Sequence, residues 1–422
     1  MNRNIDVVVV GSGPAGCTTA ILLGRAGLTV ALLEAHRDPS HYKRLCTHSI
    51  RSSATPTLRR LGLDAVLDGL NAVHHRESGW SKRGWLHERA DAMHGYNIRR
   101  ITLDPVLRAT AAETPGVELV MGAKVRELTA DADGRVSGVV AEIGGEHRRF
   151  GSRLVIGADG YTSKVAELAG LPGRVSANNR FGYQAGYQNV ELPPGWTGAL
   201  WFQEPRLNVN AIFFNNDGVA MLAAFHLKDR LAEFKRDREA ALLGSFANLT
   251  DAPDLSKAER VTNVIGTTDY PSITRRHMVR PGVALVGDAA MVGDPLNGTG
   301  CGWAFQSAEW LADAVADPLR SGGDTAIDAG ARQYQRIHRR KLLPHQLTNI
   351  ALSQAATLNP LMRTIYSAAP HDQKVADRVF SVATRNSSPL NLLDPFLLTR
   401  AVIASRKTTA TRQSSMPATG TF

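Results

Sequence analysis

Three closely spaced glycines near the start of the chain suit the binding of a pyrophosphate. Gly11, Gly13 and Gly16 follow a run of valines and open an apolar, helix-forming stretch, with Pro14 and Ala15 between them. The first glycine permits a tight turn, the second lets phosphate approach the backbone, and the third lets helix and strand pack closely. Free N–H groups at a helix start also favour phosphate. The spacing therefore predicts a dinucleotide-binding loop.

Glu34 is the second group that suits this chemistry. A carboxylate that follows the second strand of such a unit can bind the ribose hydroxyls of an adenosine. The elements that must position these groups are a buried parallel strand over 5–10, a helix over 17–26 that ends at Gly27, and a strand over 29–33. Strand, glycines, helix, strand and acid occur in the order that a dinucleotide site requires.

Two later turns place a carboxylate after a predicted strand, and a further glycine-rich stretch leads into a helix expected from about residue 301 to 315. A carboxylate at the tip of such a strand can hold a hydroxyl of a ribityl chain. The start of the following helix would stabilise negative charge on a reduced flavin. These features favour FAD over a nicotinamide dinucleotide. The residues concerned are Asp159, Gly160, Gly287, Asp288, Gly298 and Gly300.

In this order, the three motifs resemble the FAD-dependent oxidoreductase superfamily that contains class A flavoprotein monooxygenases, flavin halogenases and geranylgeranyl reductases. The likeness covers residues 1–320. It implies that Glu34 binds the adenosine ribose, that Asp288 binds the ribityl–pyrophosphate region, and that Asp159 lies on the flavin and reductant side.

The same resemblance implies three further FAD contacts. Arg44 matches a basic position near the pyrophosphate, and Arg100 precedes a helix expected over 103–114. Val125 matches a position whose backbone meets the adenine. For the two arginines, ordinary surface charge is the alternative.

The resemblance also implies an α/β fold, with a Rossmann-like FAD-binding domain, an inserted β-sheet substrate domain and a helical C-terminal segment. The expected parts are 1–78, 101–175 and 270–325 for a discontinuous FAD-binding domain, 79–100 and 176–269 for the substrate-binding sheet, 326–405 for the helical segment and 406–422 for a disordered tail.

Aromatic residues between the two acidic turns are candidates for the walls of a substrate pocket. In related proteins a sheet in this part of the chain covers the flavin, which makes Trp201, Phe213 and Phe214 candidate pocket walls. Such aromatics are more often plain core residues. The elements predicted here are strands over 199–203, 209–214 and 219–225 and an amphipathic helix over 229–249.

The loop that contains Cys46 and His48 lies where related proteins place residues along the flavin ring. Cys46 is predicted to touch flavin or substrate, or else to be a small buried apolar residue. His48 is a candidate proton donor or substrate contact, with a structural histidine as the alternative. These two are the candidate catalytic residues, and the flavin carries the chemistry, because no Ser-His-Asp order or paired-carboxylate motif is present.

The resemblance leaves more than one activity open. The leading expectation is an FAD-dependent monooxygenase in specialised metabolism. It would hydroxylate or epoxidise a mostly apolar, electron-rich small molecule through a flavin C4a-hydroperoxide, with O2 as co-substrate. The alternative is a geranylgeranyl-reductase-like reductase of prenyl or polyene double bonds, because those reductases also carry a cysteine in this loop and resemble the stretch 294–300. A third alternative is a scaffold in which FAD is structural.

Several signatures and folds are missing from the sequence. The Trp-x-Trp-x-Ile-Pro motif of the halogenases is absent, as is the Tyr-x-Trp-x-Phe-Pro stretch of the reductases. No second glycine-rich nucleotide fold appears. Electrons are therefore expected from NAD(P)H that binds transiently on the Asp159 side, or from a separate reductase.

The composition is that of an ordinary globular protein. Of 422 residues, 43% are apolar and 21% are charged. No apolar run approaches the roughly 18–20 residues that span a bilayer, and no export signal opens the chain, so a cytoplasmic location is expected. Three cysteines without a Cys-x-x-Cys spacing fit a reducing compartment. No histidine or cysteine spacing predicts a metal site.

The net charge of +10 belongs to the C-terminal part. From residue 331 onward the sequence holds 13 Lys or Arg and three Asp, which is +10. A solvated helix surface is one interpretation. The other is a docking face for an acidic carrier protein, an anionic membrane or a reductase, with Arg336, Arg339 and Arg340 as candidate contacts. No recognition module for nucleic acid accompanies the charge.

Overall fold

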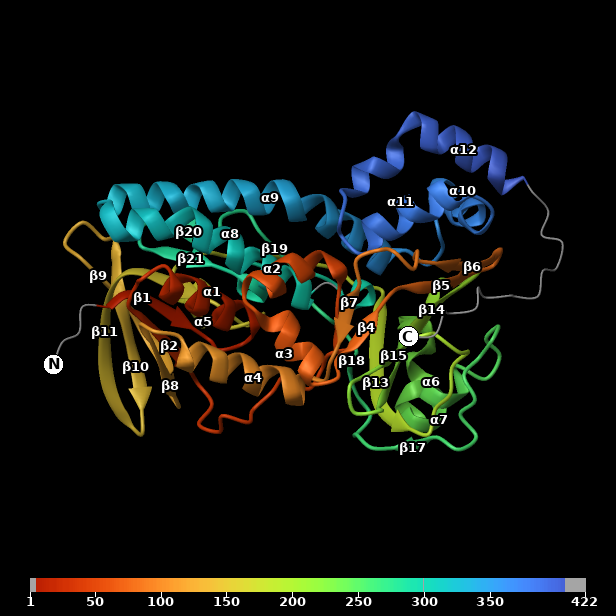
Figure 1. The fold of residues 1–422 in the computed structure, drawn as a ribbon, viewed down its shortest axis with the longest axis horizontal. Helices are drawn as coiled ribbons and strands as arrows, with labels where there is room; N and C mark the ends of the chain where they lie inside the picture. Colours follow the sequence, from red (N-terminus) through yellow and green to blue (C-terminus); the bar gives the residue numbers. More distant parts are fainter. Residues whose placement is uncertain (1–4, 299, 407–422) are drawn as a thin grey trace.

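The computed structural model describes residues 5–298 and 300–406, which form two halves built around two large sheets (Figure 1). The first half contains a mainly parallel sheet with long helices beside it. The second half contains an antiparallel sheet, and helices from the C-terminal part of the chain lie next to it. The expected α/β fold with a helical C-terminal segment is confirmed.

The first sheet has β1 (Ile5–Val10) at its centre. β2 (Val30–Glu34) and β11 (Glu146–Gly157) lie parallel to it on either side. Val7, Val8 and Val9 have no exposed surface, so both faces of the strand are covered, which explains the unbroken valine run. The other strands are β20 (Val279–Arg280), β21 (Val283–Leu285) and β8 (Val117–Met121), with β10 (Val136–Ile143) and β9 (Lys124–Ala130) added antiparallel beyond β11.

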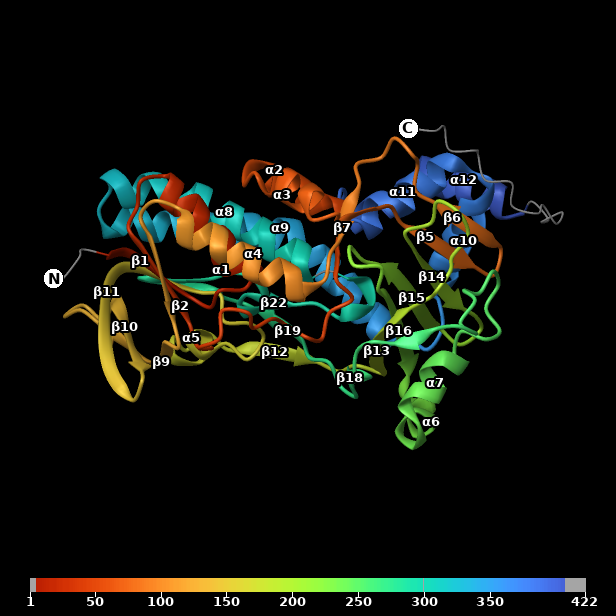
Figure 2. The same ribbon diagram turned by 60° about the horizontal axis from the view of Figure 1, so that its bottom comes forward.

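Long helices lie together on one face of this sheet (Figure 2). α1 (Pro14–Arg25) begins directly after the glycine turn, with proline at a position where its missing N–H costs no hydrogen bond. α1 packs against α4 (Arg100–Glu113) and α8 (Gly300–Ser321), and α8 packs against α9 (Asp324–Gln354). Since α1 follows β1 and α8 follows the turn after β21, both helix starts lie near the carboxyl edge of the sheet.

The second sheet is antiparallel apart from one parallel pair, β14 with β5. Its predicted strands are confirmed, and the turn at 215–218 joins two of them. The expected helix over 229–249 is instead two short helices, α6 (Leu231–Arg236) and α7 (Arg238–Gly244), because Asp237 is extended and caps the second one. The strands, in spatial order, are β17 (Glu259–Arg260), β13 (Arg180–Gln188), β16 (Ala220–Leu227), β15 (Asn208–Phe214), β14 (Gly198–Gln203), β5 (Ser78–Ser81) and β6 (Gly84–His87), with β18 (Ile265–Thr267) also paired to β13.

Smaller elements connect the two halves. One three-stranded sheet contains β3 (Ser49–Ile50), β7 (Gly95–Asn97) and β4 (Val73–His75), and another contains β12 (Gly173–Ser176), β19 (Ser272–Arg275) and β22 (Met291–Val292). The short helices are α2 (Thr55–Arg60), α3 (Leu63–Gly69) and α5 (Lys164–Leu168).

The C-terminal part is helical from α9 onward. α10 (Pro360–Ala368), α11 (Gln373–Ala383) and α12 (Pro395–Ser405) form a layer beside the second sheet, with a core of their own. The tail expected over 406–422 lies, apart from Arg406, outside the described residues. Within 5–298 and 300–406 no helix has the length and apolar character needed to cross a membrane, and no cluster of three or more His, Cys, Asp or Glu side chains is arranged to hold a metal.

Candidate functional site

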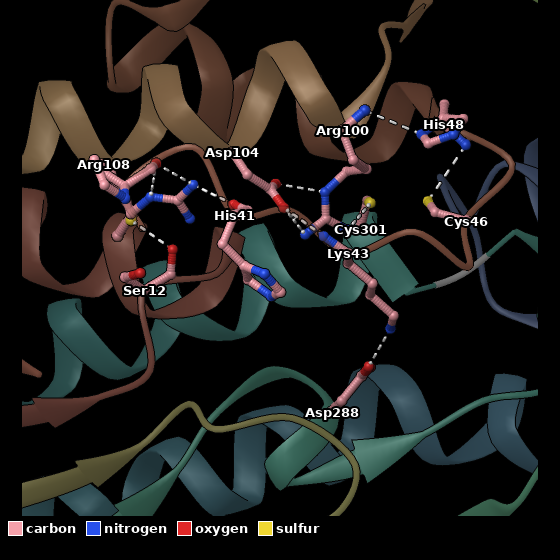
Figure 3. A network of polar contacts seen from close by, with 12 residues as sticks. Ser12, His41, Lys43, Cys46, His48, Arg100, Asp104, Arg108, Asp288 and Cys301 are labelled. Atoms are coloured by element: carbon pink, nitrogen blue, oxygen red, sulfur yellow. Dashed lines mark hydrogen bonds and ion pairs between the residues drawn. The ribbon is translucent and has the colours of Figure 1, made fainter. Parts of the chain in front are cut away.

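One cavity of about 660 Å³ runs from the glycine turn after β1 to the face of the second sheet. Cofactor and ligand cavities have volumes of roughly 300–1,000 Å³. Its walls come from the carboxyl ends of β1, β2 and β11, the loop after β2, α4, the start of α8 and strand β13. Ligands of open α/β sheets bind at this edge. Figure 3 shows the polar contacts along the cavity.

The glycine turn has the geometry that its sequence predicts. Gly11 has a φ of +100°, which only glycine adopts easily, and a Cβ on Gly16 would lie 1.8 Å from the Gly11 carbonyl oxygen. A Cβ on Gly13 would meet nothing within 4 Å, so the space above it is open. Pro14 and Ala15 line the cavity with Gly13. This open cradle at the start of α1 fits a pyrophosphate.

Glu34 lies in the cavity wall at the end of β2. Its Oε2 accepts hydrogen bonds from the Ser12 backbone N (2.9 Å) and Oγ (2.6 Å), and its Oε1 accepts one from the backbone N of His36 (3.0 Å). Burial alone would raise the pKa of this carboxyl, but the hydrogen bonds from Ser12 and His36 outweigh it and lower the pKa. Glu34 is thus held ionised, as binding of ribose hydroxyls requires. We call the part of the cavity lined by Gly11, Gly13 and Glu34 the glycine end.

A lysine, not the predicted arginine, reaches the cavity from the loop after β2. Arg44 is exposed and does not line the cavity, whereas Lys43 lines it and its Nζ lies 3.0 Å from Oδ2 of Asp288. The Asp288 charge raises the pKa of Lys43 although burial opposes this. Because successive side chains of an extended loop point in opposite directions, the sequence alone did not distinguish the two neighbours. Val125 lines the cavity near the glycine end.

Asp159 and Gly160 line the cavity after β11. The Asp159 carboxylate accepts hydrogen bonds from Ser163 Oγ (2.6 Å) and the Val165 backbone N (3.0 Å). Burial raises the pKa of Asp159 above its ordinary value. Asp159 therefore also stabilises the turn that leads into α5, a local role that the sequence did not predict.

The predicted glycines near α8 divide into two kinds. Gly298 and Gly300 line the cavity, whereas Gly287 does not. Gly287 has a φ of +57°, and a Cβ there would lie 2.8 Å from the Ala15 Cβ, so this glycine allows close packing of the turn after β21 against α1. Gly287 therefore lies behind Ala15, a residue of the cavity wall, and does not face the cavity itself.

Arg100, the first residue of α4, forms a buried ion pair with Asp104, one helical turn further on. Its Nε lies 2.5 Å from Asp104 Oδ1 and its Nη2 lies 2.9 Å from Asp104 Oδ2. Its Nη1 points to the Cys301 sulfur at 3.7 Å. Burial would lower the pKa of Arg100, but Asp104 and the two cysteines nearby raise it, so the guanidinium stays charged. Asp104 also accepts a hydrogen bond from the Lys43 backbone N (3.1 Å), which ties the loop to α4.

Cys46 and Cys301 come together at the far end of the cavity, although they lie in different elements. Both line the cavity. Interaction with the Cys301 side chain lowers the pKa of Cys46, with Arg100 acting in the same direction and burial opposing it. The Cys46 side chain and burial raise the pKa of Cys301. We call the part lined by Cys46, Arg100 and Cys301 the thiol end.

His48 does not line the cavity. Its side chain is buried, its Nδ1 accepts a hydrogen bond from the Arg100 backbone N (3.0 Å), and its own backbone N donates to the Cys46 sulfur at 3.3 Å. Burial and the charge of Arg100 lower the pKa of His48 to about 3, so the ring is neutral. The expectation of a proton donor is not met, because a neutral ring that faces α4 positions Cys46 and Arg100 instead.

The predicted aromatic pocket walls also pack elsewhere. Trp201 is fully buried on the α7 side of the second sheet, and its Nε1 donates to the Thr250 carbonyl oxygen (2.8 Å). Phe214 packs in the same cluster, and Phe213 packs under the Arg51 guanidinium, 5.7 Å from the ring centre. None of the three lines the main cavity. Successive side chains of these strands point to opposite faces of the second sheet, and both faces are covered by other parts of the protein.

Residues of β13 and β16 form this wall instead. Tyr183, Gln184 and Phe225 line the cavity, and Gln184 Nε2 donates to the Cys46 carbonyl oxygen (2.7 Å). Sequence reasoning missed strand β13, although apolar residues at every second position, with aromatic rings at Phe181, Tyr183 and Tyr187, are typical of a strand.

A second, smaller cavity of about 60 Å³ lies between the second sheet and helices α10 and α11. It is mainly apolar, with Trp80, Phe202 and Tyr366 in its walls. At its inner end Arg51 forms a buried ion pair with Glu77. A Cβ on Gly298, which lines the main cavity, would lie 3.0 Å from Arg51 Nη2, so the two cavities are separated by one loop.

Comparison with known proteins identifies relatives of most of the chain. Residues 4–342 match the family described as FAD binding domain. The chain is 28% identical over 350 residues to a menaquinone reductase of Mycolicibacterium smegmatis, covering 77% of this chain and 78% of the relative. It is 26% identical over 382 residues to a digeranylgeranylglycerophospholipid reductase of Methanothrix thermoacetophila, covering 86% and 91%. The structure of a flavin-dependent brominase, 19% identical, superposes with a TM-score of 0.76 over 95% of this chain and 98% of that one, which shows a shared fold.

Proposed function

From the premise that the chain belongs to the FAD binding domain family, we propose that it is a reductase of carbon–carbon double bonds in an apolar, isoprenoid-like substrate. That it is an FAD-dependent oxidoreductase follows from the family. The observation that carries the finer proposal is the thiol pair of Cys46 and Cys301, which can deliver a proton where the reduced product needs one.

The glycine end fits the adenosine and pyrophosphate parts of FAD. The open space above Gly13 would take the pyrophosphate, and the ionised Glu34 would bind ribose hydroxyls. Asp288, which pairs with Lys43, would bind the ribityl chain. When bound, FAD supplies a hydride equivalent to the substrate. The protein's own task is then to orient the double bond, exclude water and provide a proton.

Cys46 is the group on the cavity wall best suited to provide that proton. The neighbouring Cys301 side chain lowers the pKa of Cys46, which makes the Cys46 thiol a stronger acid than an ordinary cysteine. Reduction of an alkene adds a hydride at one carbon and a proton at the other. The Cys46 thiol would give its proton to the second carbon, which leaves one thiolate, and a proton from solvent would restore the thiol. Arg100 and the His48 backbone N stabilise the thiolate that remains.

The relatives support the same activity. Both proteins named above are reductases by name, one of menaquinone and the other of a digeranylgeranylglycerophospholipid. A monooxygenase generates a strong oxidant from O2 beside the flavin, and a reactive thiolate at that place is readily oxidised. The thiol end therefore favours reduction over oxygen transfer. We propose NAD(P)H, bound transiently on the Asp159 side, as the source of electrons.

Anaerobic turnover tests this proposal directly. Holoenzyme with NAD(P)H and a polyprenyl substrate should saturate double bonds without O2, with the product mass increased by two hydrogens for each bond. Cys46→Ser should bind FAD normally and lower kcat by about 10²–10⁴-fold, the usual contribution of a general acid. Cys17→Ser is the matched control, since Cys17 is buried in α1 and bonds to the Ser12 carbonyl oxygen. Substrate-dependent oxygen uptake with an oxygenated product would instead identify a monooxygenase.

A further inference from the structure

The last helix of the described chain, α12, has large apolar side chains that are exposed as well as apolar side chains that are buried. On the inner face Leu397, Ala401 and Ala404 are buried against α10 and α11. On the outer face Phe396 is 84% exposed and Ile403 is 61% exposed. A surface helix of a globular protein normally has one apolar stripe and a polar opposite face. Thr399 and Arg400 are also exposed, so the outer face of α12 is mixed, with more exposed apolar side chains than this rule predicts.

The neighbouring helix α11 follows the normal rule, which makes α12 an exception within one layer. α11 buries Val375, Val379 and Phe380 and turns Gln373 and Lys374 to solvent. Both helices have similar lengths and share one core. The difference therefore lies in what each outer face contacts.

The exposed apolar surface continues into the turn before α12. Leu390 is 63% exposed and Leu393 is 53% exposed. Figure 1 shows α12 at the outer edge of the molecule, away from the first sheet. Contiguous exposed apolar patches on soluble proteins mark interaction surfaces. We define the α12 patch as Leu390, Leu393, Phe396, Val402 and Ile403.

The charges around this patch are mainly positive. Residues 360–406 contain six Lys or Arg and three Asp, a net +3. All three acids are already bound: Asp394 accepts hydrogen bonds from the backbone N of Phe396 and Leu397, Asp372 pairs with Arg400 at 2.7 Å, and Asp377 accepts one from Gln373 Nε2 at 2.8 Å. Lys374 and Arg406 are exposed in the same layer. An apolar strip with such cations nearby complements a surface that is anionic outside and apolar beneath, which is the surface of a bilayer with acidic lipids.

We propose that the α12 patch docks the protein on an anionic lipid bilayer, with Phe396 and Ile403 inserted at the level of the headgroups. The helix lies in the interface and does not span the membrane. The small apolar cavity lies on the inner side of α10 and α11, the helices against which α12 packs. This inference goes beyond the proposed function and does not depend on it, because vesicle binding is measured without turnover.

Vesicle flotation of the full-length FAD-bound protein tests the proposal. The vesicles are phosphatidylcholine alone or phosphatidylcholine with phosphatidylglycerol, each at low and high salt. The parent should float with the phosphatidylglycerol vesicles, and less so at high salt. Phe396→Ser/Ile403→Ser should lower partitioning by about tenfold or more, since two inserted apolar side chains are lost. Val175→Ser is the matched control, because Val175 is 62% exposed on β12, far from α12 in the sequence. It should bind like the parent.

Three results would overturn the proposal. One is no flotation of the parent. Another is equal partitioning of the double variant and Val175→Ser; if that binding is lost at high salt, surface charges outside the α12 patch bind the vesicles. The last is a dimer in sedimentation analysis that the double variant dissociates, which would make the patch a contact between two copies. Matching far-UV spectra and thermal midpoints verify that the variants, all changed at exposed positions, remain folded.

Discussion

The two ends of the main cavity are built in different ways. At the glycine end, Gly11, Gly13 and Glu34 come from a single β1–α1–β2 unit. At the thiol end, Cys46, Arg100 and Cys301 come from a loop, α4 and α8, which are far apart along the chain. The glycine end consists of a turn whose backbone shape is fixed by glycines and of one carboxylate. The thiol end consists of a buried ion pair and two cysteine side chains that contact one another.

Because of this difference, we expect variants at the two ends to change different free energies, that of FAD binding and that of unfolding. The glycine end is preformed by steric requirements, and its variants should act mainly on FAD affinity. The thiol end contains the buried ion pair of Arg100 and Asp104 beside the two cysteines. A buried charge that loses its partner is strongly destabilising. Its variants should act on folding stability and on thiol chemistry.

The largest effect is expected for Gly16→Ala. Its Cβ would lie 1.8 Å from the Gly11 carbonyl oxygen, so the turn and α1 must move apart. We expect FAD affinity to fall by more than about 100-fold, together with a lower thermal midpoint of the apoprotein, because a 1 Å displacement removes the aligned N–H groups. Fluorescence titration with FAD and calorimetry measure both.

Gly13→Ala distinguishes the role of the turn in FAD binding from its role in the stability of the apoprotein. A Cβ there meets nothing within 4 Å, so the apoprotein should keep its thermal midpoint while FAD binding weakens. If Gly16→Ala bound FAD as tightly as the parent, the turn would not be sterically fixed and the comparison between the two ends would fail.

At the thiol end, Asp104→Ala should be the most damaging change. It leaves the buried Arg100 guanidinium without its carboxylate, which costs about 3–5 kcal/mol of unfolding free energy. Asp217→Ala removes the partner of Arg99 at a more exposed site and should cost no more than about 1 kcal/mol. Urea unfolding of the two variants gives both values. Equal losses would show that burial of the Arg100 pair is energetically unimportant.

Glu34→Ala should weaken FAD binding by about 1.5–3 kcal/mol, which is roughly 10–150-fold in Kd, through loss of charge-assisted hydrogen bonds. The alkylation rate of Cys46 by iodoacetamide should not change, since the thiol end lies in other elements. Glu118→Ala, an exposed acid on the neighbouring strand β8, is the control. A change in Cys46 reactivity in Glu34→Ala would show that the two ends are coupled.

The smallest effect is expected on the pH dependence of folding stability, through the buried His48. Its pKa is about 3 in the folded protein and ordinarily about 6.5, so the unfolded state binds the proton more tightly below pH 6.5. Stability is therefore fully present above pH 6.5 and is lost as the pH falls toward 3, by about 1 kcal/mol between pH 7 and 5.5 for this residue. His48→Asn should remove this part of the pH dependence, because asparagine tolerates the φ of +65° and can accept the Arg100 hydrogen bond. His277→Asn, at an exposed position, should leave the pH profile as in the parent. Identical profiles for parent and His48→Asn in urea unfolding would contradict the assignment.

The sequence allowed the glycine end to be predicted nearly in full. Each of its groups belongs to a local pattern. The role of Arg44 stays a prediction, but it is Lys43 and not Arg44 that lines the cavity. The thiol end was predicted in part. Cys46 was identified through its loop, and Arg100 was placed in the site, but the contact between Cys46 and Cys301 was not foreseen. Strand β13, which contributes Tyr183 and Gln184, was missed, and Trp201 and Phe213 were placed on a wall to which they do not belong.

By itself the sequence determined the α/β class, the dinucleotide unit and the helical C-terminal part, because these depend on the spacing of apolar residues and glycines within short stretches. Only the tertiary structure decided which side of each strand faces the cavity, which of two adjacent basic residues turns inward, and that residues 46 and 301 meet beside Arg100. Hydrophobic periodicity reports that a residue is buried but not against what, since both faces of the second sheet are covered. The pKa of Cys46 and the neutral state of His48 likewise arise from neighbours that folding brings together, so no local pattern contains them.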